Sequence, residues 1–376
     1  MAATEIRNIV DRERNRTQSL PPKQQAQSNQ SYNFGRPASR EGFITDPFLK
    51  ALMATAAFRR LRSIRFLGAI DFRLGRAFEG KKENIRYSRY QHSLGVARLA
   101  SLYSNIRELS LESRRLVTAA ALLHDIGHAP LSHSLEPVFR EYFDLEHHKA
   151  TYAIISGKVK LGAEVYQTLR EYKIDIERLL LLVSGKDQSF DGFFGGPINF
   201  DTIEAILRSR RYMRSNALDL DPVRVVEAAT LRANSSHERI VDNFWMLKND
   251  VYQNMIGSEA GIIADYASQQ FMRQHIEEFS KDDFYITERE FFLKAPQLYK
   301  ILTAPVFEVK FLTKHDSIST QPLRAFSIDK RYDFFARADK GRYQQIRKNY
   351  KFSIKRDKNS PLELKLEFLV NGCLWR

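Results

Sequence analysis

Cysteine is almost absent from this chain of 376 residues, which contains only Cys373. A single cysteine excludes both a disulfide framework and a zinc site built from cysteines. Long apolar runs are also missing: the longest, at 117–123 and 179–183, are well short of the roughly 18 residues that a membrane-spanning helix needs. The first 16 residues lack the apolar core of a secretory signal. We therefore expect a cytoplasmic protein without a membrane segment.

Acidic residues are the minority charge, with 45 Asp and Glu against 59 Lys and Arg, and the formal net charge is +14. Hydrophobic residues make up 43% of the chain, which excludes disorder along its whole length. Much of the positive charge lies in residues 321–376, which hold fourteen basic and six acidic side chains. A basic segment attracts anions, so we expect a nucleic-acid or nucleotide partner there. A solvated face that keeps the protein soluble is the alternative.

Composition divides the chain into three parts. Residues 1–42 are polar and rich in Gln, Ser, Asn and Pro, which predicts a mobile arm or one that docks on a partner. Residues 43–304 have the apolar spacing of helices from about Asp46 onward. Residues 305–376 contain stretches in which apolar and polar side chains alternate, as in strands, at 307–311, 351–355 and 362–368. We therefore predict a mainly α fold with a small, basic C-terminal α+β or β module.

The central part is expected to consist of successive helices. Ser113 is a candidate N-cap for the apolar stretch that ends at His124. A glycine-rich loop, GFFGGP at 192–197, interrupts the helical pattern just before another helix. Further helices are expected at 147–157, 160–172, 200–214, 221–231, 236–254 and 257–278.

Histidine is concentrated in one part of this region, because five of the nine lie between 124 and 148. His124 and Asp125 are adjacent at the end of a predicted helix, so an imidazole nitrogen and a carboxylate oxygen can reach one cation. That ligand pair suits Fe, Mn, Zn or Mg ions. His92, on the preceding helix, and Asp201, directly after the glycine-rich loop, are candidates for the remaining ligands.

Each of these residues alone has an ordinary explanation. A His-Asp dipeptide is most often a surface feature, and a single histidine on an apolar helix face is usually a hydrogen-bonded core residue. Burial of several imidazoles together with a carboxylate is costly unless something pairs them, and a metal ion does so. The combined pattern therefore favours a metal site.

Five segments of the sequence resemble a known family. They are FRRLRSIRFLG at 58–68, RYQHSLGV at 89–96, LLHDIGHAPLSH at 122–133, INFD at 198–201 and VYQ at 251–253. Together they resemble the HD-domain metal-dependent phosphohydrolases. Within that family the resemblance is to the branch of dNTP triphosphohydrolases that includes the sterile-alpha-motif HD enzyme, and it runs from about Asp46 to Ala267.

The resemblance implies a set of site residues. The implied ligands of a divalent metal ion, with Mn, Fe, Zn, Mg, Co and Ni not distinguished, are His92, His124, Asp125 and Asp201. The implied contacts to the substrate phosphates are Arg89 and Gln253. The implied catalytic imidazoles, one of them a proton donor with a pKa near neutrality, are His128, His133 and His147, or His148 in place of His147. The family also implies a nucleotide substrate and a homo-oligomer.

The chain departs from the dNTP-specific relatives around the substrate. Thr202 and Phe244 stand where those relatives tend to have Lys and Arg, so two charge-assisted contacts to a triphosphate are missing, each worth roughly 1.5–3 kcal/mol. Arg208, Arg210 and Arg211 are candidates for replacement charge, and a solvated helix face is the alternative explanation of that cluster.

The sequence therefore favours an enzyme that hydrolyses a nucleotide phosphoester with a metal-activated water. A (d)NTP triphosphohydrolase that releases nucleoside and triphosphate is the leading hypothesis. One alternative is a phosphodiesterase or nuclease of the same type that acts on single-stranded nucleic acid or a cyclic nucleotide. The other is a non-catalytic module that binds nucleotides or nucleic acid and retains the site for structure.

Overall fold

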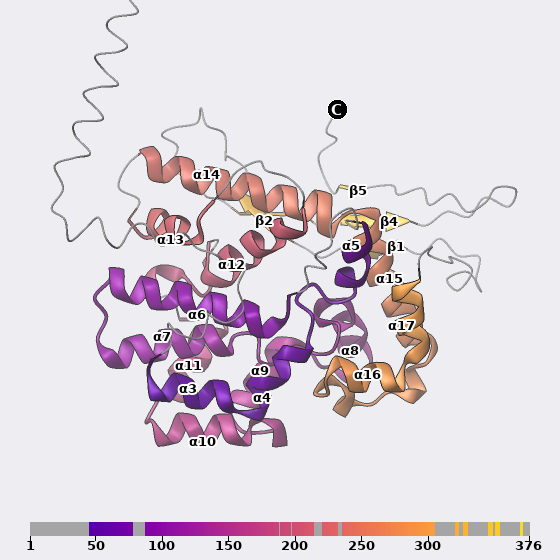
Figure 1. Cartoon of the computed structure of the whole chain (residues 1–376), viewed down its shortest axis with the longest axis horizontal. Coiled ribbons are helices and arrows are strands. Elements are labelled where there is room, and N and C mark those ends of the chain that lie inside the picture. The colour runs from indigo at the N-terminus through magenta and orange to yellow at the C-terminus, as the bar shows by residue number, and fades with distance from the viewer. Residues whose placement is uncertain are drawn as a thin grey trace, which may run out of the picture. The chain divides into compact units, whose positions relative to one another are not determined.

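The computed structural model describes residues 45–77, 87–187, 189–196, 198–213, 220–231 and 235–304, together with five short strands between residues 320 and 370. The predicted arm at 1–42 lies outside the described residues, as do the alternating stretches at 307–311 and 362–368. Helices predominate in the described part of the chain, and Figure 1 shows them in chain order from indigo to orange. The mainly α fold class is therefore confirmed.

The α-helices of the described residues are α3 (Pro47–Ala54), α4 (Ala56–Arg60), α5 (Ile70–Ala77), α6 (Arg89–Ile106), α7 (Leu111–Leu123), α8 (Glu136–Phe143), α9 (His147–Ile155), α10 (Ala163–Glu171), α11 (Ile176–Val183), α12 (Phe200–Ser209), α13 (Pro222–Leu231), α14 (Ser235–Asp250), α15 (Glu259–Gln274), α16 (Glu288–Lys294) and α17 (Pro296–Thr303). Short 3-10 segments are η3 (Leu61–Ser63), η4 (Ser132–Ser134), η5 (Lys160–Gly162), η6 (Phe190–Gly192), η7 (Arg210–Tyr212), η9 (Ile276–Glu278) and η10 (Lys281–Phe284), and η8 (Val251–Ile256) is a π-helical turn. The helices predicted between 147 and 278 are present, with ends that differ by a few residues. Among the described helices, none is both long and apolar enough to cross a membrane.

The first described helix begins where the sequence predicts. Asp46 caps α3, because its side chain accepts a hydrogen bond from the backbone N–H of Phe48 at 2.9 Å. Pro47 occupies the first helical position, where no N–H donor is needed. Arg115 of α7 donates to the same carboxylate at 2.7 Å, so the cap also ties α3 to α7.

Helices α6 and α7 lie side by side (Figure 1) and carry much of the candidate site. Ser88 begins α6 with a capping box: its hydroxyl accepts a hydrogen bond from the N–H of Gln91 at 3.3 Å, and the side chain of Gln91 accepts one from the N–H of Ser88 at 3.0 Å. This cap fixes the start of the helix, so Arg89 is its first residue and His92 follows within the first turn.

The start of α7 differs from the prediction. Ser110, not Ser113, is the N-cap, and its hydroxyl accepts a hydrogen bond from the N–H of Ser113 at 3.2 Å. The earlier start places Glu112 in the first turn, where a negative charge complements the helix dipole. The helix ends just before His124, so His124 and Asp125 lie in the turn that follows it.

Apolar side chains from α3 to α17 form one continuous core. Phe200, the first residue of α12, is buried in this core and lies against Tyr103 of α6, with ring centroids 5.5 Å apart. Asn199 caps the same helix by accepting a hydrogen bond from the N–H of Thr202 at 2.7 Å. Together these contacts hold the first turn of α12 against α6 and thereby place Asp201.

The described strands form two small antiparallel groups. Strand β4 (Tyr350–Ser353) lies between β1 (Thr320–Pro322) and β5 (Leu369–Val370), and β2 (Phe326–Asp329) pairs with β3 (Gln345–Lys348). Strand β4 overlaps the stretch 351–355, in which the sequence predicts a strand. The boundary between a helical domain at 43–304 and a module at 305–376 stays a prediction.

Candidate metal centre and histidine cluster

Three helices bring the four predicted metal ligands close together. His92 lies in the first turn of α6, His124 and Asp125 follow α7, and Asp201 lies in the first turn of α12. The Nε2 atoms of His92 and His124 are 3.3 Å apart. Oδ1 of Asp201 lies 3.0 Å from Nε2 of His92 and 3.7 Å from Nε2 of His124.

Asp125 completes this group, which we call the candidate centre. Its Oδ2 lies 3.4 Å from Nε2 of His92, and its Oδ1 lies 3.4 Å from Nε2 of His124. Ligand atoms about 2.1 Å from one ion, at octahedral or tetrahedral angles, are roughly 3.0–3.4 Å apart. Most of the separations in the centre fall in that range. His92, His124 and Asp125 therefore form a group that could hold a metal ion, and Oδ1 of Asp201 adds a fourth possible ligand atom beside both imidazoles.

Burial is uneven within the candidate centre. The side chain of His92 is fully buried, and those of Asp125 and His124 are 6% and 12% exposed. The side chain of Asp201 is 51% exposed. Asp201 is therefore the ligand on the solvent side.

The second nitrogen of each imidazole in the centre already has a protein partner. Nδ1 of His124 donates to the carbonyl of Ala121 at 2.8 Å, and Nδ1 of His92 donates to Oε2 of Glu204 at 2.6 Å. Because both partners are acceptors, Nδ1 carries the proton in each neutral ring and the lone pair of Nε2 faces the centre. Proteins orient metal-binding histidines in this way, so the residues present fit a divalent ion.

Glu204, one turn after Asp201 on α12, is itself held in place. Arg208 pairs with it through Nε at 3.0 Å and through a second, shorter contact from Nη2, and both side chains are buried. A Cβ on Gly95 of α6 would lie 2.1 Å from Oε1 of Glu204, so glycine leaves the room that this carboxylate occupies. The solvated helix face suggested by the sequence is therefore wrong at Arg208, because its guanidinium is used to neutralise a buried carboxylate.

Charges in the candidate centre shift one another's pKa values. Burial alone would lower the pKa of His124, but the carboxylates of Asp125 and Asp201 raise it to about 9. Partial desolvation opposes ionisation of Asp201, yet hydrogen bonds with His124 and His92 hold its pKa well below its usual range. The carboxylates thus favour positive charge among them, and a divalent ion supplies such charge.

Arg89 lies directly beside the centre. Its Nη1 donates to Oδ2 of Asp125 at 2.7 Å, and its Nε donates to Oγ of Ser132 at 3.1 Å. Arg89 and Asp125 are both buried. The guanidinium therefore adjoins the ligand set, which is the position that its predicted phosphate contact requires.

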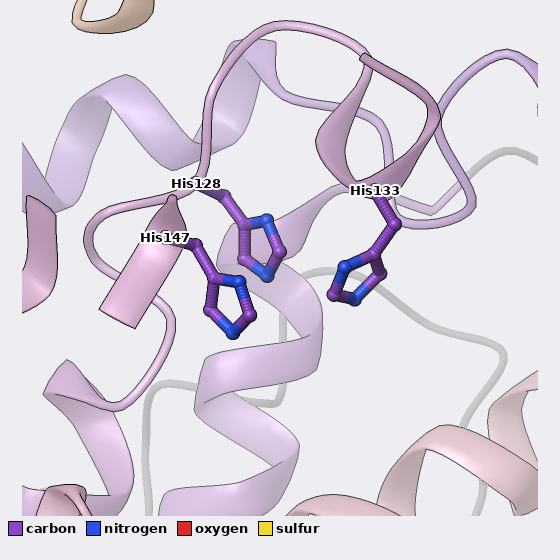
Figure 2. A group of neighbouring side chains, drawn as sticks. All are labelled: His128, His133 and His147. Carbon is purple, nitrogen blue, oxygen red and sulfur yellow. The ribbon is translucent and has the colours of Figure 1, made fainter. Parts of the chain in front are cut away.

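A second cluster, which we call the histidine cluster, consists of His128, His133 and His147 (Figure 2). The rings of His128 and His147 are stacked with centroids 4.5 Å apart, and His133 meets His128 edge-on at 4.7 Å. Nε2 of His128 lies 3.2 Å from Oδ1 of Asp125, so the cluster adjoins the candidate centre. Of the two histidines that the sequence left open, His147 lies in the cluster and His148 is exposed.

Glu136 of α8 connects two members of the histidine cluster. Its Oε2 accepts a hydrogen bond from Nδ1 of His133 at 2.9 Å, and its Oε1 accepts bonds from Nδ1 and the backbone N–H of His147 at 2.5 and 3.1 Å. Burial alone would raise the pKa of Glu136, but these bonds hold it far below its usual range. His128, by contrast, is buried, and its Nδ1 has no hydrogen-bond partner among the described residues.

Two members of the histidine cluster, His128 and His133, are held neutral. Burial lowers the pKa of His133 to about 4, and burial together with the charge of Arg89 places the pKa of His128 well below its usual range. These values differ from the near-neutral pKa that the resemblance implies for a proton donor. The negative charge of a bound phosphate would raise both pKa values and so bring the rings closer to that role.

The chain just before His133 adopts an uncommon conformation. Leu131 and Ser132 both have positive φ angles, 57° and 47°. Oε1 of Glu288, in α16, accepts a hydrogen bond from the N–H of Leu131 at 3.2 Å, and Oγ of Ser132 donates to the carbonyl of Arg65 at 2.7 Å. Helix α16 thus helps to fix the loop that presents His133.

Among the other predicted residues, Gln253 lies in the π-helical turn η8, and its side chain is outside the described part of the chain. The sequence analysis missed Glu136, Glu204 and Glu288. The spacing of two of them could have indicated that they lie beside predicted site residues. Glu136 follows His133 by three residues, and Glu204 follows Asp201 by three on the same helix. Glu288 had no such spacing, because its contacts are far away in the sequence.

Residues 89–189 match the family model of the HD domain. This segment of the chain is an HD domain. The HD match contains His92, His124 and Asp125, whereas Asp201 lies beyond its end. A crystal structure of a hypothetical protein from Aquifex aeolicus has a similar fold, with a TM-score of 0.54 and 21% identity over 74% of each chain.

Three curated proteins that resemble parts of this chain are informative. YwfO of Bacillus subtilis, an uncharacterized protein, is 36% identical over 143 residues, which are 37% of this chain and 29% of YwfO. The uncharacterized MG461 of Mycoplasma genitalium is 25% identical over 254 residues, 62% of this chain and 57% of MG461. Deoxynucleoside triphosphate triphosphohydrolase SAMHD1 of Gallus gallus is 33% identical over 144 residues, 34% of this chain and 22% of SAMHD1. The matches thus cover less than two thirds of each of these relatives.

Proposed function

We propose that this protein is a nucleoside triphosphate triphosphohydrolase that acts on (d)NTPs and releases nucleoside and triphosphate. The HD domain and the SAMHD1 relatives support the broader assignment of a metal-dependent phosphohydrolase. The observation that carries the proposal is the meeting of two imidazole Nε2 atoms and two carboxylates beside the guanidinium of Arg89.

The proposed ligands of the divalent ion are His92, His124, Asp125 and Asp201. An ion bound there supplies Lewis acidity toward a phosphoryl oxygen and toward the attacking water. Arg89 offers its planar guanidinium to phosphate oxygens, which suits bidentate contact. Its existing bond to Asp125 keeps the guanidinium in position before substrate binds.

The histidine cluster handles protons in this proposal. Glu136 fixes Nδ1 of His133 and of His147 as hydrogen-bond donors, so that Nε2 of each ring is the atom that exchanges a proton. A phosphate that binds beside His133 raises the pKa of that ring, and the protonated ring then donates to the departing oxygen. His128, whose Nδ1 has no hydrogen-bond partner among the described residues, offers a further contact to the substrate.

A substrate panel tests the proposal. Purified protein is incubated with Mn²⁺, Fe²⁺, Co²⁺, Ni²⁺ or Mg²⁺ and with dNTPs, NTPs, cyclic nucleotides or single strands, and products are identified by mass spectrometry. We expect nucleoside and triphosphate from the wild type, none from Asp125→Asn, and unchanged turnover from Asp282→Asn, which alters an exposed carboxylate. Absence of turnover on every substrate would refute an enzymatic role, and shortened single strands would favour a nuclease instead.

Two further expectations stay predictions. The homo-oligomer implied by the family is checked by light scattering of the purified protein. The nucleic-acid partner of the basic residues 321–376 is checked by single-strand binding at low and high salt, because phosphate contacts weaken as salt rises.

A further inference from the structure

Glu288, the first residue of α16, joins two backbone segments that lie far from it in the sequence. Its Oε1 accepts hydrogen bonds from the N–H of Arg65 at 2.7 Å and from the N–H of Leu131 at 3.2 Å. Its Oε2 lies 3.3 Å from Nε of Arg65. The side chain of Glu288 is buried, so these bonds are shielded from water. One carboxylate of α16 therefore holds the two segments together.

Both segments meet at the hydroxyl of Ser132. Ser132 follows Leu131, and its Oγ donates to the carbonyl of Arg65 at 2.7 Å. The same Oγ accepts a hydrogen bond from Nε of Arg89 at 3.1 Å. Ser132 and Arg89 are both buried. The contacts of Glu288 thus converge on the side chain that holds one edge of the Arg89 guanidinium.

The backbone at Ser132 has a conformation that depends on its surroundings. Leu131 and Ser132 are consecutive residues with φ angles of 57° and 47°, in the left-handed region that residues with a Cβ rarely adopt. Such residues persist where neighbouring groups hold them. The bonds from Leu131 to Glu288 and from Ser132 to Arg65 are two such restraints. Loss of the Glu288 carboxylate would remove the first and, through Arg65, loosen the second.

Arg60 restrains the same loop from its other end. Its buried guanidinium donates to the carbonyls of His128 at 2.6 Å and Ile126 at 3.1 Å, which lie earlier in the loop. It also donates to the carbonyl of Ile286, two residues before Glu288, at 3.1 Å. The start of α16 is thereby tied to both ends of the loop, so Glu288 is itself fixed relative to the site.

We propose that Glu288 is a positioning residue: it holds Ser132 in place, and Ser132 in turn orients the guanidinium of Arg89 for phosphate oxygens. Arg89 donates to Asp125 through Nη1 and to Ser132 through Nε, so two bonds fix the plane of its guanidinium. With one of them lost, the group can rotate about the other, and its fork no longer matches a phosphate in a fixed position. The proposal rests on the function proposed above, in which Arg89 contacts the substrate phosphates.

The alternative is that Glu288 only stabilises the fold. In that case, phosphate affinity would change no more than in any other variant of equal stability, and the effects of Glu288 and Ser132 variants would add. A positioning role predicts instead that the two variants share one effect, because both act through the same hydroxyl. It also predicts rescue by glutamine, whose side-chain oxygen can accept from both N–H groups.

Triphosphate binding separates these roles. Inorganic triphosphate is titrated into each protein loaded with Mn²⁺, with metal content and melting temperature measured in parallel. We expect Glu288→Met and Ser132→Ala each to bind triphosphate about 10-fold more weakly, because the charged guanidinium loses an orienting hydrogen bond. The double variant should also lose about 10-fold, whereas independent effects would multiply to about 100-fold. Glu288→Gln should bind nearly as the wild type does, and metal content should not change.

Leu169→Ala is the control for stability, since it opens a cavity in the core at α10. It should lower the melting temperature and leave triphosphate affinity unchanged. If Glu288→Met does not fold, Glu288→Asp takes its place alone and in the double variant, because the shorter acid draws its oxygens back from Leu131.

Wild-type affinity in Glu288→Met would overturn the proposal, as would multiplied effects in the double variant, equal weakness in Glu288→Gln or an equal loss in Leu169→Ala. Absence of triphosphate binding by the wild type would overturn it too. Failure of the proposed function looks different. In that case triphosphate binding keeps its shared dependence on Glu288 and Ser132, while the wild type hydrolyses no nucleotide. That result supports the positioning role and removes only the assignment of the phosphate to a substrate.

Discussion

Nδ1 of His92 and Oε2 of Glu204 are 2.6 Å apart, and both side chains are buried. The carboxylate fixes the imidazole with its Nε2 toward Asp125, Asp201 and His124. Neither residue could adopt this geometry alone, because the histidine comes from α6 and the carboxylate from α12. The pair therefore links the packing of two helices to the metal affinity of the candidate centre.

Glu204→Gln should weaken metal binding. The amide oxygen still accepts a hydrogen bond from His92, but the negative charge is lost and Arg208 is left buried without its ion pair. Loss of a partner that orients a metal-binding histidine typically lowers affinity by about 10- to 100-fold. The measurement is titration with Mn²⁺ or Zn²⁺, with circular dichroism to check folding. Glu177→Gln, an exposed substitution, is the control, and equal affinity in both variants would argue against the orienting role.

Gly95→Ala should have a related effect without removal of any charged group. The added Cβ would lie 2.1 Å from Oε1 and 2.6 Å from Cδ of Glu204, so the carboxylate must move. We expect lower metal affinity and a lower melting temperature. The double variant Gly95→Ala with Glu204→Asp, in which the acid is shorter, should recover part of the loss. An unaffected Gly95→Ala variant would show that the carboxylate has room to move. A loss that the double variant does not recover would argue against a clash with this carboxylate as its cause.

Removal of metal should lower thermal stability. A ligand present at 100 times its dissociation constant stabilises the folded state by about 2.7 kcal/mol, provided that it does not bind the unfolded chain. We therefore expect added Mn²⁺ to raise the melting temperature of the wild type and chelator to reverse the rise. Asp201→Asn should lack this response, whereas Asp282→Asn should keep it. A full metal response in Asp201→Asn would remove this carboxylate from the ligand set.

Glu288 should make stability depend on pH. Burial raises its pKa from 4.5 to about 7, although the charge of Arg65 opposes the shift. The folded state keeps a proton there that the unfolded chain releases above pH 4.5, so the free energy of unfolding falls as pH rises through 4.5–7. The effect amounts to roughly 3 kcal/mol at its full extent.

Glu288→Gln removes this titration but keeps an oxygen that can accept from Leu131. Urea denaturation at pH 5 and pH 8 checks the prediction. At each pH, the free energy of unfolding of the wild type is subtracted from that of the variant. This difference should be larger at pH 8 than at pH 5. The same difference at both pH values would mean that Glu288 is not protonated in the folded protein near neutrality.

The members of the candidate centre could be chosen from the sequence, because imidazole and carboxylate groups rarely interrupt apolar helices without a reason. That His92 and Asp201 approach each other is a property of how α6 packs on α12. Glu204 could not be chosen, since a charged residue on a helix has the same appearance in sequence whether it faces water or a buried partner. Arg208 shows the consequence, because a cluster of three arginines resembles a solvated face until Glu204 is placed beside it.

Local ambiguity accounts for a different kind of error. Ser110 and Ser113 are chemically equivalent caps for α7, and periodicity does not choose between them. The choice moved one helix end but left His124 and Asp125 in the turn after it, because Gly127 and Pro130 determine where that helix stops. Errors of this kind shift boundaries without moving the chemistry.

The exposure of Asp201 has a kinetic consequence. Three of the four candidate ligands are shielded by the surrounding helices. An ion from solution therefore contacts the half-exposed carboxylate of Asp201 before the other ligands, and a departing ion contacts it last. Exchange of the bound ion should therefore depend on motion of this one side chain and of the first turn of α12, while the remainder of the fold stays closed.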